Sequence, residues 1–431
     1  MSLTDELNSV ISVSSDIVFN LLSRKGKEIY FPKKGILGQS AEAKTKKINA
    51  TIGIANEDDG TPMRLSMIAD KLHIDSKRAF PYAPSYGDME LRKKWKELIL
   101  KKNPSIQNEI SLPVVSCALT HGIFISAFMF VDTDDEIITS DYNWDNYNLI
   151  FENAFEAKQD TFPTFVKNED GNEDFNVLGL KEKIMHSKKP IVLLNFPNNP
   201  TGYTPSKQTA HRLAEMLTDC AKQKPILVIC DDAYFGLVYK EGIYTESMFS
   251  LLSNASENLL CIKLDGATKE DYVWGFRVGF ITYGIKSGTK ELYTALEDKT
   301  AGAIRANVSN VSLLSQSLVY DGFSHTDYEK EKKDKFDILK ERFLEVERVL
   351  NENNDRYSKH FKPLPYNSGY FMCIKLNSLD GEAVRKKLLE KYDTGIIAFG
   401  SVIRIAFSGV AKSKIAQMFE NIYCACEELS S

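Results

Sequence analysis

A lysine and an arginine eight residues apart form the most informative chemical pair in the sequence. Lys269 and Arg277 follow the apolar run 259–264, and the arginine lies in a Gly-x-Arg-x-Gly frame. A lysine amine can form a Schiff base with an aldehyde, and a fixed arginine can hold a phosphate. Pyridoxal phosphate needs both partners. The pair therefore indicates a site for such a cofactor.

Further polar groups follow two other apolar runs. An Asn-Pro-Thr-Gly turn begins at Asn199, shortly after the run 191–194, and Asp231 and Tyr234 come directly after the run 226–230. Alone, the first motif is typical of a turn and the second of a solvated loop. Together with the lysine and the arginine they form an ordered series that chance rarely supplies. The neighbouring Asp232 is expected to be a solvated or capping residue.

The elements that would position these groups alternate along the chain. Between about 113 and 284, β-rich runs alternate with amphipathic stretches, and buried strands are expected at 137–139, 191–194, 226–230 and 280–283. One helix between them is expected to be capped by Thr204, with Pro205 in its first turn. Its apolar stripe is Ala210, Leu213, Ala214, Leu217 and Ala221. This alternation predicts an α/β fold with a mostly parallel sheet, in which ligands bind at the carboxyl ends of the strands.

The chain has 431 residues, which suits two packed domains. A charged helix over 327–351 is expected to lead into the second domain. We expect an N-terminal arm at 1–15, a small domain made of 16–62 and 338–431, and a large cofactor-binding domain at 63–337.

Composition excludes several classes of function. The net charge is −5, so no basic stripe predicts nucleic-acid binding. The N-terminus has no signal-peptide pattern, and no apolar run is long enough for a membrane span. Seven cysteines are scattered without metal-ligand spacing. They are interpreted as reduced residues of a cytoplasmic protein, without a disulfide framework or a zinc site.

With these motifs in order, the chain resembles the fold-type-I pyridoxal-phosphate-dependent aminotransferases of the aspartate and aromatic amino acid kind. The likeness runs from about Ile48 to Arg404. The matching segments are 48–54 with the acidic turn 56–60, Tyr82-Ala83-Pro84 with Glu90-Leu91-Arg92, Trp144–Tyr147, Asn199–Gly202, Asp231–Tyr234, Lys269–Gly279, Arg305–Asn310 and Arg404-Ile405. The resemblance implies a large domain with a mostly parallel seven-stranded sheet covered by helices, and a smaller α+β domain.

The resemblance also implies three catalytic residues. Lys269 would bind the cofactor covalently and, once released by the substrate, move the proton at the substrate Cα. Asp231 would pair with the pyridinium nitrogen and keep it protonated. Tyr234, together with Asn199, would hydrogen-bond the oxygen of the cofactor ring.

Other matched residues would hold the cofactor and the substrate. Trp144 would stack on the cofactor ring, and Arg277 would pair with the phosphate. The phosphate would also meet the Thr268 hydroxyl and the first amides of a helical stretch, at Gly122, Ile123 and Phe124. Arg404 would clamp the substrate α-carboxylate, and the substrate site would also include Gly53, Trp144, Asn199 and Arg305.

Two residues are expected to act across a subunit interface, because the family's site lies there. Tyr82 would reach the cofactor phosphate of a neighbouring copy, and Arg305 the far end of its substrate. The resemblance therefore implies a homodimer. Two positions depart from the family pattern: Gly266 stands where a serine is usual, and Tyr147 stands where a histidine is usual.

The expected activity is transfer of an α-amino group between an amino acid and a 2-oxo acid by a ping-pong mechanism. Arg305 favours a dicarboxylate such as aspartate or glutamate, and aromatic substrates stay open. A β-decarboxylase or lyase that uses the same cofactor is the alternative. A third hypothesis is a non-catalytic regulator that binds the cofactor. Regulators of this kind carry an added DNA-binding domain, and we expect no residues to remain for one here.

Overall fold

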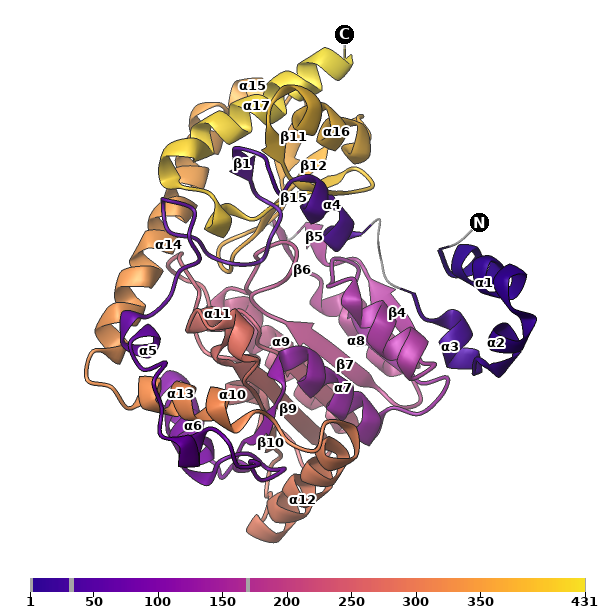
Figure 1. Cartoon of the computed structure of the whole chain (residues 1–431), viewed down its shortest axis with the longest axis vertical. Coiled ribbons are helices and arrows are strands. Elements are labelled where there is room, and N and C mark those ends of the chain that lie inside the picture. Colours follow the sequence, from indigo (N-terminus) through magenta and orange to yellow (C-terminus); the bar gives the residue numbers. More distant parts are fainter. Residues whose placement is uncertain (1–2, 31–34, 168–170, 431) are drawn as a thin grey trace.

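The computed structural model describes residues 3–30, 35–167 and 171–430 and has a seven-stranded sheet at its centre (Figure 1). The strands are, in order across the sheet, β2 (Val114–Ser116), β10 (Gly279–Gly284), β9 (Leu259–Gly266), β8 (Ile226–Asp231), β7 (Ile191–Asn195), β3 (Glu136–Ser140) and β4 (Lys158–Phe162). The five strands from β9 to β4 are parallel, and β10 is antiparallel to both of its neighbours. The predicted mostly parallel seven-stranded sheet is therefore confirmed.

Helices cover both faces of this sheet, which explains why its strands are apolar throughout. Alternate residues of β7 point to opposite faces: Ile191 and Leu193 join one core cluster, and Val192 and Leu194 join the other. The covering helices are α6 (Met89–Lys102), α7 (Ala118–Phe130), α8 (Val177–His186), α9 (Lys207–Ala221), α10 (Met248–Leu252), α12 (Lys290–Asn307) and α13 (Leu313–Phe323).

The cap predicted for α9 is wrong by two residues. Ser206 is the cap, and its side chain accepts a hydrogen bond from Thr209 N. The Thr204 hydroxyl instead shares a 2.7 Å hydrogen bond with the Ser368 hydroxyl, far along the chain. The predicted apolar stripe of the helix is buried.

A second, antiparallel sheet lies above the first in Figure 1. It contains β11 (Phe361–Pro363), β12 (Met372–Leu376), β15 (Val402–Ile405) and β14 (Ile397–Phe399), with α16 (Gly381–Lys391) and α17 (Lys412–Ser430) beside it. The long helix α14 (Tyr328–Glu352) connects the two parts of the molecule (Figure 1), close to the predicted 327–351. This is the smaller α+β part of the predicted fold class.

The N-terminal segment contacts both parts. Helices α1 (Leu3–Ser14), α2 (Asp16–Leu21) and α3 (Arg24–Glu28) project from the side of the central sheet (Figure 1). There, Lys25 Nζ donates to the Ala154 carbonyl at 2.8 Å. Helix α4 (Ile36–Glu42) lies against the second sheet, where Gln39 Nε2 donates to the Ala398 carbonyl at 2.9 Å. The exact domain boundaries stay a prediction.

The remaining elements are short connections. They are β1 (Ile48–Asn49) paired with β13 (Thr394–Gly395), the hairpin of β5 (Phe165–Lys167) and β6 (Glu173–Phe175), helices α5 (Ser66–Ala69), α11 (Ala267–Glu270) and α15 (Asn354–Tyr357), the 3-10 turns 76–78, 274–276 and 407–409, and a π-helical turn over 148–154. Across the part of the chain that the structure describes, no helix has the length and apolar character to cross a membrane.

Candidate active site

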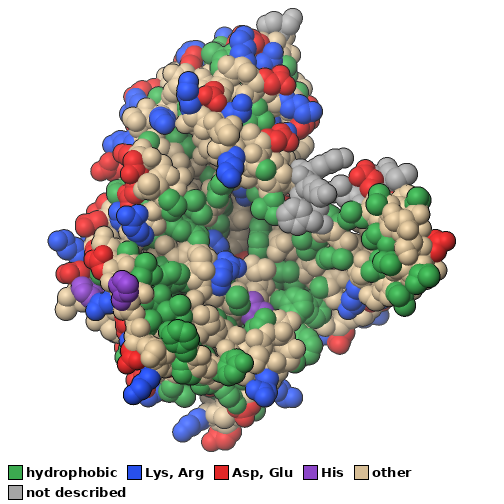
Figure 2. Space-filling view, viewed as in Figure 1, with side chains coloured by type: hydrophobic (Ala, Val, Ile, Leu, Met, Phe, Trp, Pro, Cys, Tyr) green, Lys and Arg blue, Asp and Glu red, His purple; other side chains and the backbone are tan. Residues whose placement is uncertain are grey.

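A cavity of about 330 Å³ opens at the carboxyl edge of the central sheet. Figure 2 shows the corresponding hollow between the two parts of the molecule, with basic side chains at its edge. Asn195 and Asp231 are register partners at the ends of β7 and β8, which places both side chains at this edge. Eight of the predicted site residues line the cavity: Gly53, Trp144, Asn199, Asp231, Tyr234, Lys269, Arg277 and Arg404.

Asp231 is buried and firmly held. Its Oδ2 accepts a 2.5 Å hydrogen bond from the Tyr147 hydroxyl, and its Oδ1 accepts one from Ala233 N at 3.2 Å. Burial raises the pKa of Asp231, while the Tyr147 hydrogen bond opposes that rise. The tyrosine at the family's histidine position therefore supports Asp231, a role that the sequence alone did not assign to it.

Lys269 lies on α11, directly after β9, and is half-buried in the cavity. Its Nζ lies 5.3 Å from the centre of the Tyr234 ring, and its backbone carbonyl accepts a 2.7 Å hydrogen bond from the Tyr370 hydroxyl. Burial lowers the pKa of Lys269 to about 8, and Arg277 adds to this effect while Asp231 opposes it. More of the amine is thus neutral near physiological pH, as a nucleophile requires.

The N-terminus of α7 faces the cavity, but not with the residues that the sequence predicted. The helix begins at Ala118, so the lining residues are Ala118, Leu119 and Thr120. Gly122, Ile123 and Phe124 do not line the cavity. Ile123 is buried in the core, and the Phe124 ring packs against Phe155. The helix starts two residues before Thr120, so its free amide groups lie in the turn before the predicted Gly122, Ile123 and Phe124.

Two glycines allow this close approach of α7. Gly266 and Gly279 are register partners in the β9–β10 pair. A Cβ on Gly266 would lie 2.7 Å from the Val278 carbonyl oxygen, and one on Gly279 would lie 2.8 Å from Ala118 Cα. This backbone therefore has no room for the family's serine at position 266. The nearby Thr268 hydroxyl is buried without a hydrogen-bond partner among the described residues.

Arg277 completes this end of the cavity. It has left-handed backbone geometry with φ of 55°, and its Nη1 donates weakly to the Trp274 carbonyl at 3.5 Å. No carboxylate of the described residues lies within ion-pair distance of its guanidinium. Arg277 and the N-terminus of α7 line the cavity together, and both suit an anion. Thr268 is not among the residues that line the cavity, so its predicted contact with the phosphate stays a prediction.

Arg404 occupies the opposite wall. It lies on β15 and is only 2% exposed. Its Nη1 donates to Asn199 Oδ1 at 3.1 Å and its Nη2 to the Thr51 carbonyl at 2.9 Å, while Nε has no partner among the described residues. The guanidinium also lies 4.4 Å from the centre of the Phe371 ring. These contacts fix its orientation and leave donor capacity for a carboxylate.

Trp144 and Gly53 shape the space between these two ends. The Trp144 ring packs edge-on against Tyr147, with ring centres 5.5 Å apart. A Cβ on Gly53 would lie 3.0 Å from the Phe371 ring, so a larger residue there would crowd the cavity wall.

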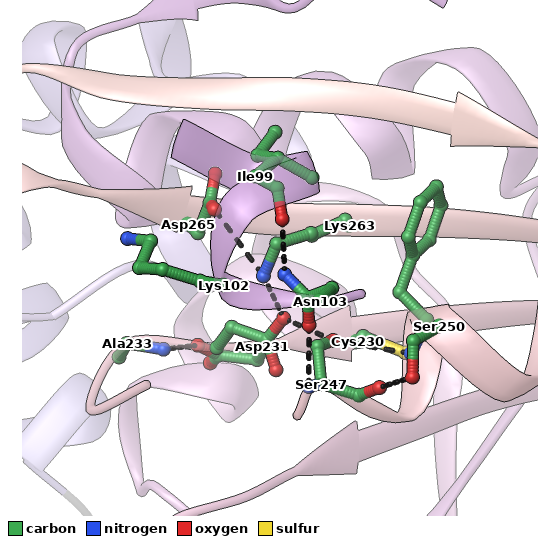
Figure 3. Close-up of polar contacts among 12 residues, drawn as sticks. Ile99, Lys102, Asn103, Cys230, Asp231, Ala233, Ser247, Ser250, Lys263 and Asp265 are labelled. Carbon is green, nitrogen blue, oxygen red and sulfur yellow. Dashed lines mark hydrogen bonds and ion pairs between the residues drawn. The ribbon is translucent and has the colours of Figure 1, made fainter. Parts of the chain in front are cut away.

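A buried ionic cluster lies behind the cavity. Lys263 on β9 contacts the carboxylate of Asp232. Its Nζ also lies 3.2 Å from the carboxylate of Asp265 (Figure 3). Ser247 Oγ donates to Asp232 at 2.6 Å, and Trp95 Nε1 donates to Asp265 at 2.9 Å. The expectation that Asp232 is solvated is therefore wrong, because Lys263 provides a buried counter-charge.

Tyr82 and Arg305 lie outside this cavity. Tyr82 is 90% exposed, and Arg305 is an exposed residue in the last turn of α12. Their expected action on a second copy stays a prediction.

Comparisons with known proteins agree on one family. The family described as aminotransferase class I and II matches residues 45–422. The crystal structure of an aminotransferase from Anaerococcus prevotii DSM 20548 has a TM-score of 0.81 at 26% identity, covering 94% of this chain and 99% of that chain. The kynurenine aminotransferase of Pyrococcus horikoshii, solved in complex with PMP, shares the fold with a TM-score of 0.79 at 16% identity, covering 97% and 100%.

A curated relative is similar over a shorter region. The probable aspartate aminotransferase of Methanocaldococcus jannaschii is 26% identical over 231 residues, which are 53% of this chain and 56% of that protein. The chain spans a little over half the length of the curated relatives it matches.

Proposed function

Because the chain belongs to the class I and II aminotransferases, we propose that it transfers an α-amino group between an amino acid and a 2-oxo acid with pyridoxal phosphate as cofactor. The reaction follows a ping-pong mechanism, and the candidate donors are aspartate, glutamate and aromatic amino acids. The observation that carries this proposal is the convergence of Lys269, Asp231 and Arg404 on one cavity.

The cavity residues fit this cofactor. When bound, pyridoxal phosphate supplies an aldehyde that captures amines and a ring that accepts electrons. Arg277, the first turn of α7 and the unpaired Thr268 hydroxyl would hold its phosphate. The carboxylate of Asp231 would hold its ring nitrogen, and Trp144 would cover one face of the ring.

Lys269 and Asp231 divide the proton chemistry between them. Lys269 Nζ would hold the cofactor, and its free amine would move the proton at the substrate Cα. General acid/base help of this kind is worth roughly 10²–10⁴-fold in rate. Asp231 would keep a proton on the ring nitrogen, a role that requires a buried carboxylate to stay ionised. The hydrogen bond from Tyr147 favours that ionised form.

Arg404 orients the substrate. Its remaining donors bind the α-carboxylate, and hydrogen bonds to charged groups contribute about 1.5–3 kcal/mol. Its contacts with Asn199 and Thr51 hold the guanidinium in place, and this would orient the bound substrate in the cavity that Lys269 also lines.

The proposal includes a homodimer in which Tyr82 and Arg305 of each copy serve the other copy's site. Its support is that both side chains are exposed and lie outside the cavity of their own chain. A cytoplasmic location is part of the same proposal and rests on the pattern of the cysteines, all seven of which are free thiols.

Absorbance spectra of the purified holoenzyme, titrated with glutamate, aspartate and tyrosine, test the function. At least one of these amino acids should convert the bound cofactor and release its 2-oxo acid in equal amount. No conversion by any of the three would defeat the proposal. Release of carbon dioxide or ammonia without the matching 2-oxo acid would favour the decarboxylase or lyase alternative.

A further inference from the structure

A second chamber of about 310 Å³ adjoins the active-site cavity. The two spaces share Ile36, Trp144, Asn199 and Arg404 in their walls. Because Arg404 binds the α-carboxylate in the proposed function, the chamber adjoins the substrate position. It offers space along this shared wall for the side chain of a bound amino acid.

Most of the chamber wall is apolar. The aliphatic and aromatic lining includes Ile36, Trp144, Pro200, Ile397 and Phe399. Such a wall suits the apolar body of a side chain and has few groups that could bind a charged end.

The charged side chains that line the chamber are Asp141, Asp145 and Arg404, and two of them are already engaged by other groups. Asp141 lines it, but its Oδ1 is used by a turn, where it accepts hydrogen bonds from Thr164 N at 2.8 Å and Thr164 Oγ1 at 2.6 Å. Arg404 is the one lining cation among the described residues, and it is committed to Asn199, Thr51 and the α-carboxylate.

Asp145 is the remaining charged group. No lysine or arginine of the described residues lies within ion-pair distance of its carboxylate, although it feels the charge of Arg404. Burial raises the pKa of Asp145 and Arg404 opposes that rise. Its side chain is exposed at the chamber wall, so a second carboxylate that entered the chamber would meet a like charge that solvent screens in part.

We propose that this chamber is the subsite for the substrate side chain and that Asp145 selects against side chains that end in a carboxylate. The inference rests on the proposed aminotransferase function and narrows its substrate class. Favoured substrates have an apolar body and a neutral or cationic end that can donate a hydrogen bond to Asp145. The dicarboxylate preference predicted from Arg305 is replaced by a preference for amides, hydroxylated aromatics or amines.

Glutamine and glutamate provide a matched test, because they differ in charge and hardly in shape. We expect the wild-type holoenzyme to have the higher kcat/KM for glutamine. Asp145→Asn should shift the ratio of kcat/KM for glutamate to that for glutamine about fivefold toward glutamate, as expected for removing one solvent-screened like charge at short range. The control is Asp219→Asn, the same change on the exposed face of α9, which should leave the ratio unchanged.

The affinity for unreactive ligands tests the subsite independently of turnover. Calorimetry with glutarate and its monoamide should show tighter binding of the monoamide to the wild type, and a smaller difference in Asp145→Asn. Asp145→Ser repeats the neutralisation without an amide. An unchanged ratio and an unchanged binding difference in both variants would overturn the proposal. Absence of turnover with every amino acid, combined with the expected binding difference, would defeat the proposed function and leave the subsite assignment standing.

Discussion

Removal of the Tyr147 hydroxyl tests whether this residue holds the catalytic carboxylate. Tyr147→Phe deletes the 2.5 Å hydrogen bond to Asp231 Oδ2 and keeps the ring that packs against Trp144. The tyrosine is 1% exposed, so water cannot easily replace the lost donor. Burial then raises the pKa of Asp231 with less opposition.

The expected loss of kcat follows from the strength of the deleted hydrogen bond. A hydrogen bond to a charged group contributes about 1.5–3 kcal/mol. If loss of this hydrogen bond raises the activation free energy by the full amount, kcat falls by between about ten- and 150-fold. The pH profile should change as well. Asp231 loses its charge as the pH falls through its pKa, so a higher pKa moves the acid side of the profile to higher pH.

Steady-state kinetics across pH measures both effects, and Tyr283→Phe is the matched control. Tyr283 belongs to the same core cluster and loses one 2.7 Å hydroxyl contact with Thr300, far from Asp231. We expect the control to keep kcat and its pH profile. Equal losses of kcat in the two variants, or an unshifted profile in Tyr147→Phe, would refute the reasoning.

Three further changes have defined outcomes. In the cofactor-free protein, Lys269→Met should raise the free energy of unfolding, because burial lowers the lysine pKa from 10.5 to about 8 and so penalises the charged amine. Urea unfolding should show this gain in full below about pH 8 and its loss as the pH rises toward 10.5. Arg404→Ala should raise the KM for the amino acid between about ten- and a hundredfold, with the absorbance of the bound cofactor retained. Lys263→Met should cost about 3–5 kcal/mol at pH 7, because it leaves the carboxylates of Asp232 and Asp265 buried and uncompensated. That loss should shrink as the pH falls, because burial raises the pKa of Asp232 to about 6 even with Lys263 present, and removing the lysine raises it further. Protonation of Asp232 then removes the uncompensated charge.

The sequence predicted those features that depend on residues close together in the chain. The runs 137–139, 191–194 and 226–230 became the neighbouring parallel strands β3, β7 and β8, since short apolar runs between helices favour that pairing. The run 280–283 became β10, which is a buried strand but antiparallel to its neighbours. Asp231, Asn199 and Lys269 met in one cavity, because each follows a strand of the same sheet edge. The spacing of apolar residues and the order of the motifs along the chain were enough to predict these features.

Features that depend on distant contacts were missed. The start of α7 has no polar cap in the sequence, and its position is set by the approach of Ala118 to Gly279 on β10. Thr204 looked like a helix cap, but Ser368 takes its hydroxyl from the other part of the chain. Asp232 looked solvated, because the lysine that neutralises it lies 31 residues away on the next strand.

Substrate class is where motif and structure diverge most. Arg305 matches a family position that favours a second carboxylate, yet in its own chain it is exposed and outside both chambers. Asp145 carries the opposite charge and lines the chamber next to Arg404. Both side chains are exposed, but Coulomb energy falls with distance, so the charge that lines the chamber acts on a substrate there more strongly than one outside it. We therefore expect Asp145 to select the substrate class within one chain, and the kcat/KM ratio for glutamate and glutamine in Asp145→Asn tests this expectation.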